Sequence, residues 1–585
     1  MIKPGDDMNI KLPCLWLLLA LPYNHAVLAA QVPAAAITGC DRACLESHIE
    51  NYLQALAARD AARIKVTDDV VFSENNQVLK LGDGSWQTMT GTGTYRHYFA
   101  DPQTSQAAVI STMRENGRGV IYDLRLRLKG DRISEIESMV IRSPGGAAQY
   151  EKMGSPPPNF RQIIPADQRN TRDELLTIPR EYLKGMENND PNGDYSFFDN
   201  DCNRYEHAVK TTNSEPKHVG HTDNTTFSTM TCAAQFSGGG LAFVTRIRDE
   251  RYHTTMVVDE EKQALFGFVF LDHNGTVRSI TRKDGTVSTI PAYFSTPRGL
   301  NVGEAWRVRN NKLLEIEMTL TEVPYGTRPQ FGLNDTGNDW LTPKNINPNT
   351  ARIATDCDQQ CLHRVTDSFL NALVVHDYSK LPLAPNIHYR ENGVDLALGD
   401  GLWGTATRVN DYRVYLGNPQ SGEAGFFGTI TETDVQGLLS ARLLIRDGRI
   451  RDINVTVMRH EYTGERGGTL SLFYPQLDSM FKPEQFHETE AELNQAGNSR
   501  LDDLMAQAAA MALNSRDSRI LVADTAHGLV LQQSISDITN AGAPQPDARS
   551  SGSYSVLTTT LYKFNGQKLL LTKSVSKPVP YRMPL

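Results

Sequence analysis

Residues 40–143 of this 585-residue chain recur as residues 357–460, at a constant offset of 317 residues. The two segments share a Cys-x-x-x-Cys pair, an aromatic-x-Glu-Asn segment, a Leu-Gly-Asp-Gly-x-Trp turn and an Arg-Ile pair near the end. A match of this length without a gap means that the chain contains two copies of one domain. Any fold proposed for the chain therefore has to accommodate both copies.

Two more diverged copies follow the same plan. One contains a helix that ends in Tyr-Leu-Lys-Gly-Met-Glu-Asn-Asn-Asp and a strand that ends at Glu206. The last resembles it, because both close on Val-Pro-Tyr, at Tyr325 and Tyr581, and because Val522 aligns with Val258. We therefore expect a leader over residues 1–30 and copies 1, 2, 3 and 4 over residues 40–143, 170–330, 357–460 and 498–585, the fourth being partial.

Each full copy begins with a helix and continues with strands. In copy 1 the apolar residues of the first segment recur at helical spacing: Leu45, Ile49, Tyr52, Leu53 and Leu56. Alternating apolar residues then predict strands, and the copy ends in a hairpin over residues 121–141. A helix followed by a curved antiparallel sheet that wraps around it is an α+β design.

This order of motifs resembles the SnoaL-like group of the nuclear-transport-factor-2-like (NTF2-like) superfamily. The resemblance rests on the Leu-x-Ala-Leu-x-x-x-Asp helix end, the Val-x-Phe-x-Glu-Asn strand and the Gly-x-Ile-x-x-Ile hairpin. In copy 2 it also rests on Arg248-Asp-Glu-Arg-Tyr, Val257-Val-Asp-Glu-Glu and Phe270-Leu-Asp-His. It implies repeated NTF2-like cone units. The superfamily includes isomerases, dehydratases, cyclases, epoxide hydrolases and binding modules, so the fold leaves the function open.

The leader is typical of export. Lys3 and Lys11 precede an apolar run over residues 12–22 that is too short to span a membrane, and residues 27–30 offer a cleavage site. A buried N-terminal helix is the alternative. The net charge of −9 and the absence of a long basic run argue against a nucleic-acid partner. We expect an exported protein, periplasmic or extracellular, without a membrane span.

Removal of the leader leaves six cysteines, an even number, as an oxidising compartment permits. Ile-Thr-Gly-Cys40 resembles a lipoprotein processing box, and lipid anchoring there is one interpretation. The repeat favours a structural pair, because Cys357 cannot be a lipidation site yet stands in the same motif. Cysteines four residues apart in a first helical turn are within disulfide reach. The predicted disulfides are Cys40–Cys44, Cys357–Cys361 and, by exclusion, Cys202–Cys232.

One carboxylate recurs in the first three copies, as Glu74, Glu206 and Glu391. The resemblance places it where ketosteroid isomerases carry a base, and strand alternation puts Glu74 on the same face as Phe72. A carboxylate on an apolar face is costly unless it is paired, and its pKa rises towards that of a useful base. For copies 1 and 3 we favour the alternative, a structural glutamate that pairs with an internal arginine or caps the following loop.

Copy 2 contains the richest set of polar side chains. We expect Glu206 and His273 to be catalytic, assisted by Tyr205 and Arg248, because a carboxylate, a histidine and a tyrosine in an apolar cone can transfer protons. A cross-strand ion pair between Arg248 and Asp259 is the structural alternative. The expected binding residues are Tyr182, Asp259, Glu74 and Glu391.

No dinucleotide-binding, phosphate-binding, nucleophile-elbow or metallohydrolase motif occurs in supporting context, so we expect no cofactor. The cysteine pairs lack clustered histidines, and His218 and His221 lie in a polar segment, so we expect no metal site. The leading hypothesis is a protein that binds a small apolar or polycyclic molecule, with a cofactor-independent dehydration or isomerisation in copy 2. The alternative is a non-catalytic binding or interaction scaffold.

Domains of this superfamily often pair through the outer faces of their sheets. Four units in one chain can pair within the molecule, which predicts a monomer. We expect copies 1 and 3, the most similar in sequence, to pair with each other, and copy 2 to pair with the partial copy 4.

Overall fold

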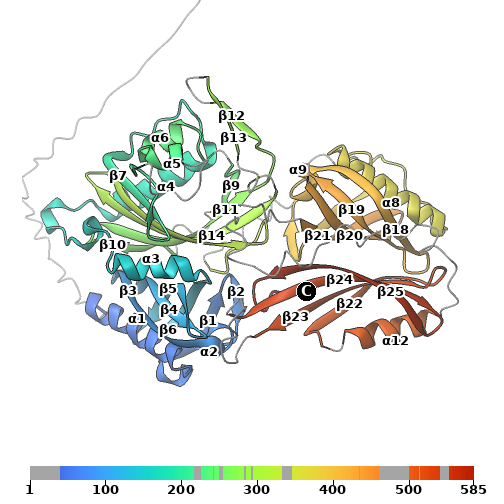
Figure 1. Ribbon diagram of the computed structural model, residues 1–585, viewed down its shortest axis with the longest axis horizontal. Coiled ribbons are helices and arrows are strands. Elements are labelled where there is room, and N and C mark those ends of the chain that lie inside the picture. Colours follow the sequence, from blue (N-terminus) through green and yellow to red (C-terminus); the bar gives the residue numbers. More distant parts are fainter. Residues whose placement is uncertain are drawn as a thin grey trace, which may run out of the picture. The chain divides into compact units, whose positions relative to one another are not determined.

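The computed structural model describes residues 40–215, 225–241, 243–248, 255–281, 285–290, 294, 296–331, 346–433, 435–459, 500–512, 514–539 and 552–585 (Figure 1). These residues form helices followed by runs of consecutive strands, and the fold class is α+β, as the sequence predicts. The predicted leader over residues 1–30 lies outside the described residues, as do His218 and His221.

Copy 1 is one helix on a six-stranded sheet with the strand order β2-β1-β6-β5-β4-β3. Helix α1 lies against β3 and β4, and β1 runs parallel to β6. Its elements are α1 (Arg42–Ala57), η1 (Ala61–Arg63), β1 (Val66–Glu74), β2 (Gln77–Leu79), α2 (Ser85–Thr88), β3 (Met89–Asp101), β4 (Gln106–Glu115), β5 (Arg118–Lys129) and β6 (Arg132–Ile141).

Copy 3 repeats this plan with the order β17-β16-β21-β20-β19-β18, and α8 lies on β18 and β19. The paired residues correspond at the offset of the sequence repeat: Glu74 lies opposite Ser138, and Glu391 lies opposite Val455. The elements are α8 (Gln359–Val374), β16 (Leu383–Glu391), β17 (Val394–Leu396), α9 (Leu402–Thr405), β18 (Ala406–Asn418), β19 (Glu423–Glu432), β20 (Val435–Arg446) and β21 (Arg449–Arg459).

The opening helix of copies 1 and 3 begins at an aspartate between the two cysteines. Asp41 accepts a hydrogen bond from the backbone N–H of Cys44 at 2.9 Å, and Asp358 does the same for Cys361 at 2.8 Å. These contacts satisfy a donor that the first helical turn leaves free. All three predicted disulfides are present, with Cα atoms 5.2 to 5.9 Å apart. They are compatible with an exported protein.

Replacing both Cys357 and Cys361 with alanine is expected to destabilise copy 3 by about 2 kcal/mol, because the four-residue loop no longer restricts the unfolded chain. Urea unfolding of the full chain, followed by the hydrogen exchange of peptides from α8 at each urea concentration, measures this loss. An unchanged midpoint would show that the bridge adds nothing beyond the aspartate cap.

Copy 2 has a seven-stranded sheet in which β10-β11-β14-β15-β7-β8 are neighbours and β9 also pairs with β11. Helix α4 lies on its inner face, against β9, β10, β11, β14 and β15. The elements are α4 (Arg172–Asn188), β7 (Phe198–Glu206), β8 (Val209–Lys210), α5 (Thr225–Thr229), α6 (Cys232–Ser237), β9 (Arg246–Arg248), β10 (Val257–Asp259), β11 (Ala264–His273), β12 (Ser279–Thr281), β13 (Val287–Thr289), β14 (Arg298–Arg309) and β15 (Lys312–Val323). Helix α3 (Pro144–Met153) and two short turns, η2 (Pro158–Arg161) and η3 (Ala166–Gln168), connect copy 1 to copy 2.

Copy 4 is a four-stranded sheet, β22-β23-β24-β25, which matches the run β10-β11-β14-β15 of copy 2. Asp524 ends β22 opposite Leu529, as Asp259 ends β10 opposite Ala264. Asp524 therefore corresponds to Asp259, and the alignment of Val522 with Val258 expected from the sequence is wrong by one residue. The elements are α12 (Leu501–Met511), β22 (Asp517–Asp524), β23 (Leu529–Ile538), β24 (Tyr554–Asn565) and β25 (Lys568–Val579).

The outer faces of the sheets pair copy 1 with copy 2 and copy 3 with copy 4. One apolar cluster joins Phe99, Ile110 and Met139 of copy 1 to Phe266 and Ala305 of copy 2, and α3 packs against it. A second cluster joins the outer faces of copies 3 and 4, with these members: Val414, Leu416, Phe427, Leu438, Val522, Leu531, Leu561 and Val575. The expectation that copy 1 pairs with copy 3, and copy 2 with copy 4, is wrong.

The two pairs use the same polar contact. Asp259 accepts hydrogen bonds from Arg42 of α1 and from the backbone N–H of Ala100 at 3.3 Å. Asp524 accepts them from Gln359 of α8 and from the backbone N–H of Gly417 at 3.2 Å. The repeated unit is therefore a pair of unlike copies. Copies 1 and 3 have equivalent positions in the two pairs.

None of the helices in the described parts of the chain combines the length and the apolar composition needed to cross a membrane.

Candidate functional site

The recurring glutamate of copy 1 is held in a buried ion cluster. Glu74 Oε2 accepts a hydrogen bond from the backbone N–H of Ser85, the first residue of α2, at 2.8 Å. Arg142 lies 3.8 Å from Glu74 and 2.8 Å from Glu115. Gly84 has a positive φ of 64°, and a Cβ there would lie 2.8 Å from the Glu74 carboxylate, so the second glycine of Gly-Asp-Gly makes room for this cluster.

Copy 3 repeats the cluster with shorter distances. Arg459 lies 2.6 Å from both Glu391 and Glu432, and Glu391 accepts the backbone N–H of Leu402 at 2.8 Å. The hydroxyl of Tyr389 also donates to Glu391 at 2.9 Å. In copies 1 and 3 the glutamate therefore pairs with an internal arginine and caps the short helix that follows. This is the structural role that the sequence favoured for these two copies, in place of a catalytic base.

Copy 2 has no arginine at the equivalent position. Glu74 and Glu391 pair with Ser138 and Val455 on the neighbouring strand, and the arginines Arg142 and Arg459 come four residues after these partners in the sequence. Glu206 pairs with Met318, and the residue four positions after Met318 is Glu322, not an arginine. Glu206 pairs instead with Arg204 on its own strand at 3.1 Å, and a third of its side chain is exposed. The charge at the centre of copy 2 is thus arranged differently from that of copies 1 and 3.

A second carboxylate, Glu304, lies on the inner face of copy 2 two strands away from this pair, because Met318 of β15 is the strand partner of both Glu304 and Glu206. It stands between Val302 and Trp306 on β14, which both belong to the core under α4. The hydroxyl of Tyr182, from α4, donates to Glu304 Oε1 at 2.8 Å, and both residues are fully buried. We call Tyr182, Arg204, Glu206 and Glu304 the Glu304 cluster.

Burial raises the pKa of Glu304 to about 7, although the hydrogen bond from Tyr182 and the charge of Arg204 both lower it. The carboxyl therefore exists in both protonation states near neutral pH. A group with this property can accept a proton in one step and return it in the next.

Three buried polar atoms around the Glu304 cluster have no hydrogen-bond partner among the described residues: Glu304 Oε2, Arg204 Nη2 and Trp306 Nε1. Buried polar atoms are normally paired, since an unpaired one costs about 1–3 kcal/mol. One of the three is a carboxylate oxygen and two are N–H donors. Each therefore has hydrogen-bonding capacity that no described residue uses.

Aromatic rings form the apolar wall of this site. The ring centroid of Tyr182 lies 6.1 Å from that of Phe198, 5.4 Å from Phe236 and 6.4 Å from Trp306. Phe236 lies on α6, which the Cys202–Cys232 disulfide joins to β7 two residues before Arg204. The predicted bridge thus fixes one wall of the site to the strand that carries its cation.

The structure does not bring the expected catalytic set together. Tyr205 alternates with Arg204 and Glu206, so it lies on the opposite face of β7. His273 is buried at the end of β11, where its Nδ1 lies 3.1 Å from the carbonyl oxygen of Phe243, and burial lowers its pKa to about 3. The side chain of Arg248 lies outside the described residues.

The expected binding residues also lie in different places. Tyr182 belongs to the Glu304 cluster, whereas Asp259 binds Arg42 between copies 1 and 2. Sequence reasoning missed Glu304 and Arg204. The strand alternation applied to Glu74 also places Glu304 between Val302 and Trp306 on an apolar face, so the signal was present in the sequence.

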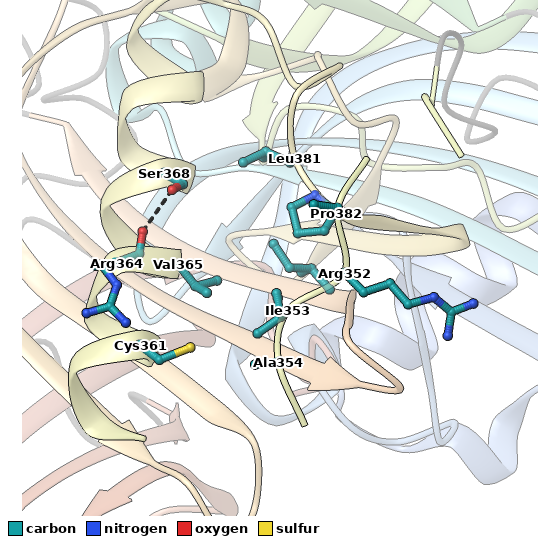
Figure 2. A pocket seen from close by; sticks show the side chains of 11 residues that line it. Arg352, Ile353, Ala354, Cys361, Arg364, Val365, Ser368, Leu381 and Pro382 are labelled. Carbon is teal, nitrogen blue, oxygen red and sulfur yellow. Dashed lines mark hydrogen bonds between the residues drawn. The ribbon is translucent and has the colours of Figure 1, made fainter. Parts of the chain in front are cut away.

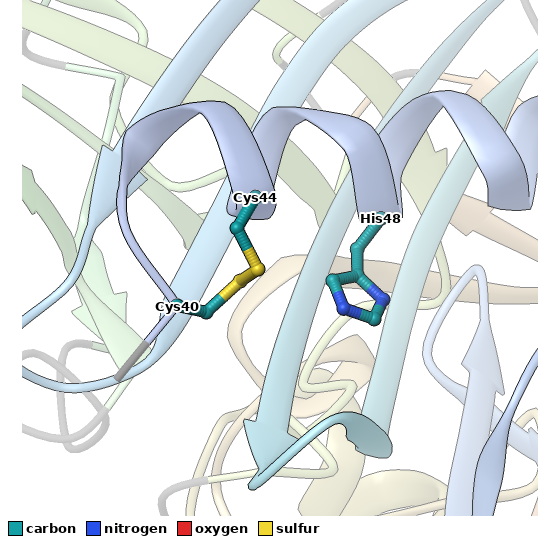
Figure 3. A group of neighbouring side chains, drawn as sticks. All are labelled: Cys40, Cys44 and His48. Atoms are coloured by element: carbon teal, nitrogen blue, oxygen red, sulfur yellow. A yellow bond between two sulfur atoms is a disulfide. The ribbon is translucent and has the colours of Figure 1, made fainter. Parts of the chain in front are cut away.

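Among the described residues, Cys40, Cys44 and His48 are the only group of three or more His, Cys, Asp or Glu whose ligand atoms all lie within 4.8 Å of one another, as a metal site requires. Figure 3 shows the two sulfur atoms joined in a disulfide and His48 one turn further along α1. The cysteines are therefore not thiolates, which are the form that binds metals.

A cavity of about 210 Å³ lies in copy 3 between α8 and residues 351–354 (Figure 2). Ile353, Val365 and Leu381 form its apolar surface, with Arg364 and Ser368 on α8. No Asp, Glu or His lines it, so it offers no group for proton transfer. The Glu304 cluster is the better candidate site.

The model of a family described as a domain of unknown function, DUF8021, matches residues 168–320. This range begins just before α4 and ends within β15, so it contains every residue of the Glu304 cluster. Comparison with curated proteins gives no match.

Proposed function

We propose that this protein is an exported, SnoaL-like multi-copy protein in which copy 2 binds a small apolar or polycyclic molecule and transfers a proton through Glu304. The observation that carries the proposal is the buried, unpartnered Oε2 of a carboxyl whose pKa is about 7. Glu304 takes the role first expected of Glu206 and His273, and no cofactor is required.

The chemistry follows from the atoms around the carboxyl. Ionised Glu304 removes a proton from a carbon next to a carbonyl group, and the electron pair moves onto the carbonyl oxygen. Arg204 Nη2 and Trp306 Nε1 donate hydrogen bonds to that oxygen as its charge develops. Protonated Glu304 then returns the proton to a different carbon, which is an isomerisation, or to a leaving hydroxyl group, which is a dehydration.

In this proposal copies 1, 3 and 4 are the scaffold that holds copy 2. Copies 1 and 3 have their recurring glutamate bound in an ion cluster. Their cores also receive a tyrosine from another copy: Tyr581 of copy 4 in copy 1 and Tyr325 of copy 2 in copy 3. This packing supports the non-catalytic alternative for these copies, and the pairing within the chain supports a monomer.

Deuterium exchange tests the proposal without knowledge of the natural substrate. The purified protein is incubated in heavy water with a panel of cyclic ketones and enones, and mass spectrometry measures deuterium at the carbon next to the carbonyl. We expect the wild type to accelerate exchange for at least one probe, and Glu304→Gln to abolish this effect. The matched control is Glu181→Gln on α4, beside Tyr182 and outside the cluster; exchange equal in all three proteins, or absent throughout, would contradict the proposal.

A further inference from the structure

The two Val-Pro-Tyr segments each bind the Gly-Asp-Gly loop in the other half of the chain. The hydroxyl of Tyr325, in copy 2, donates to Asp400 of copy 3 at 2.7 Å. The hydroxyl of Tyr581, in copy 4, donates to Asp83 of copy 1 at 3.0 Å. Asp83 and Asp400 are equivalent in the sequence repeat, and the two tyrosines follow equivalent last strands. The contact is therefore reciprocal.

Each aspartate also binds an arginine from the same copy as its tyrosine. Arg246 lies 3.2 Å from Asp400, and Arg582 lies 3.2 Å from Asp83. Each aspartate thus receives one phenol and one guanidinium from the other half. Hydrogen bonds to a charged group are the stronger ones in proteins, so these sites anchor the contact.

The tyrosine rings bury apolar surface at the same points. Tyr325 is 6% exposed and belongs to the apolar core of copy 3, and Tyr581 is 6% exposed and belongs to the core of copy 1. A buried aromatic ring with a satisfied hydroxyl is the kind of residue that contributes most to protein interfaces. Neither ring can keep these contacts if the halves separate.

We infer that residues 40–331 and 346–585 are the two partners of a twofold dimer that is joined in one chain, and that the two reciprocal Tyr–Asp contacts form its interaction surface. A surface used twice in reciprocal fashion is the signature of an isologous contact between two like partners. The partner that fits each half is therefore the other half, and the connection between them is not needed for their association. This inference is independent of the chemistry proposed for Glu304.

Cleavage of the full chain tests the inference. A recognition site for a sequence-specific protease is inserted between Phe331 and Ile346, the folded protein is cut, and analytical ultracentrifugation measures association over a range of concentrations. We expect the wild-type halves to stay together. Y325F and Y581F should each raise the Kd about tenfold, and the double variant about 100-fold, as for loss of one or two hydrogen bonds to a charged group.

The matched control is Y195F, which removes a hydroxyl that donates to the backbone carbonyl oxygen of Asp190 within copy 2 at 2.6 Å. Its Kd should equal that of the wild type. Circular dichroism of the uncut variants checks that each is folded before cleavage. Wild-type halves that separate at micromolar concentration would overturn the inference, and so would a double variant whose Kd equals that of Y195F.

Discussion

Replacing Arg459 with methionine is expected to destabilise copy 3 by about 3–5 kcal/mol, because Glu391 and Glu432 remain buried without their cation. Methionine keeps most of the side-chain volume, so the loss reports the charge and not a cavity. Hydrogen exchange followed by mass spectrometry, on peptides that cover α9 and β16, measures it. The protection of these peptides should fall by at least a hundredfold.

Arg451→Met is the control for this substitution. Arg451 pairs with Asp447 on the surface at 2.6 Å, and such exposed pairs contribute less than about 1 kcal/mol. Equal protection in the two variants would contradict a structural role for Glu391. In that case its burial would have to serve another purpose, such as the base suggested by the family resemblance.

Replacing Glu304 with glutamine should lower turnover of a substrate found by the exchange assay by about a hundredfold or more, the usual scale for the loss of a positioned acid–base group. Glutamine keeps the shape and can still accept the hydrogen bond from Tyr182. The fold should therefore persist, and kcat should fall more than KM rises.

Tyr182→Phe provides the comparison for this prediction. It removes one hydrogen bond but leaves the carboxyl, so kcat should fall less than in Glu304→Gln, and the pH at which activity rises should move. Tyr195→Phe, which removes a hydroxyl outside the cluster, should leave both unchanged. A Glu304→Gln enzyme with wild-type turnover would exclude Glu304 as the proton carrier.

Local features of this fold could be predicted from the sequence. The disulfides Cys40–Cys44 and Cys357–Cys361 depend on residues one helical turn apart, and the repeat fixed their interpretation. The structural role of Glu74 and Glu391 was also accessible, because the arginines that bind them keep the same register as the rest of the repeat. In each case the partners belong to one copy.

The pairing of the copies could not be predicted in the same way. Similarity between copies 1 and 3 shows common ancestry, whereas pairing depends on complementary surfaces. Asp259 and Asp524 complement Arg42 and Gln359 from a different copy, and no periodicity within one copy indicates this. Glu206 likewise differs from Glu74 and Glu391 because Glu322 stands where the other two copies have an arginine. This correspondence can be recognised only when the strand register is known.

The most direct test of the account is the pH dependence of stability in Glu304→Gln relative to wild type. The pKa of Glu304 rises from 4.5 to about 7 on folding, so its folded form keeps a proton that the unfolded form loses. The contribution of Glu304 to wild-type stability therefore falls between pH 4.5 and 7, whereas glutamine has no proton to lose. The free energy of unfolding of the variant, minus that of the wild type, should increase by about 2–4 kcal/mol over this interval.

Urea unfolding at pH 5 and pH 8 measures this difference, with Asp69→Asn as the control. Asp69 is exposed, and its pKa is lowered from an ordinary value of 3.8 that already lies below the interval, so its substitution should give the same difference at both pH values. The account predicts a rise for Glu304→Gln and none for Asp69→Asn. A difference for Glu304→Gln that does not change between pH 5 and pH 8 would contradict it.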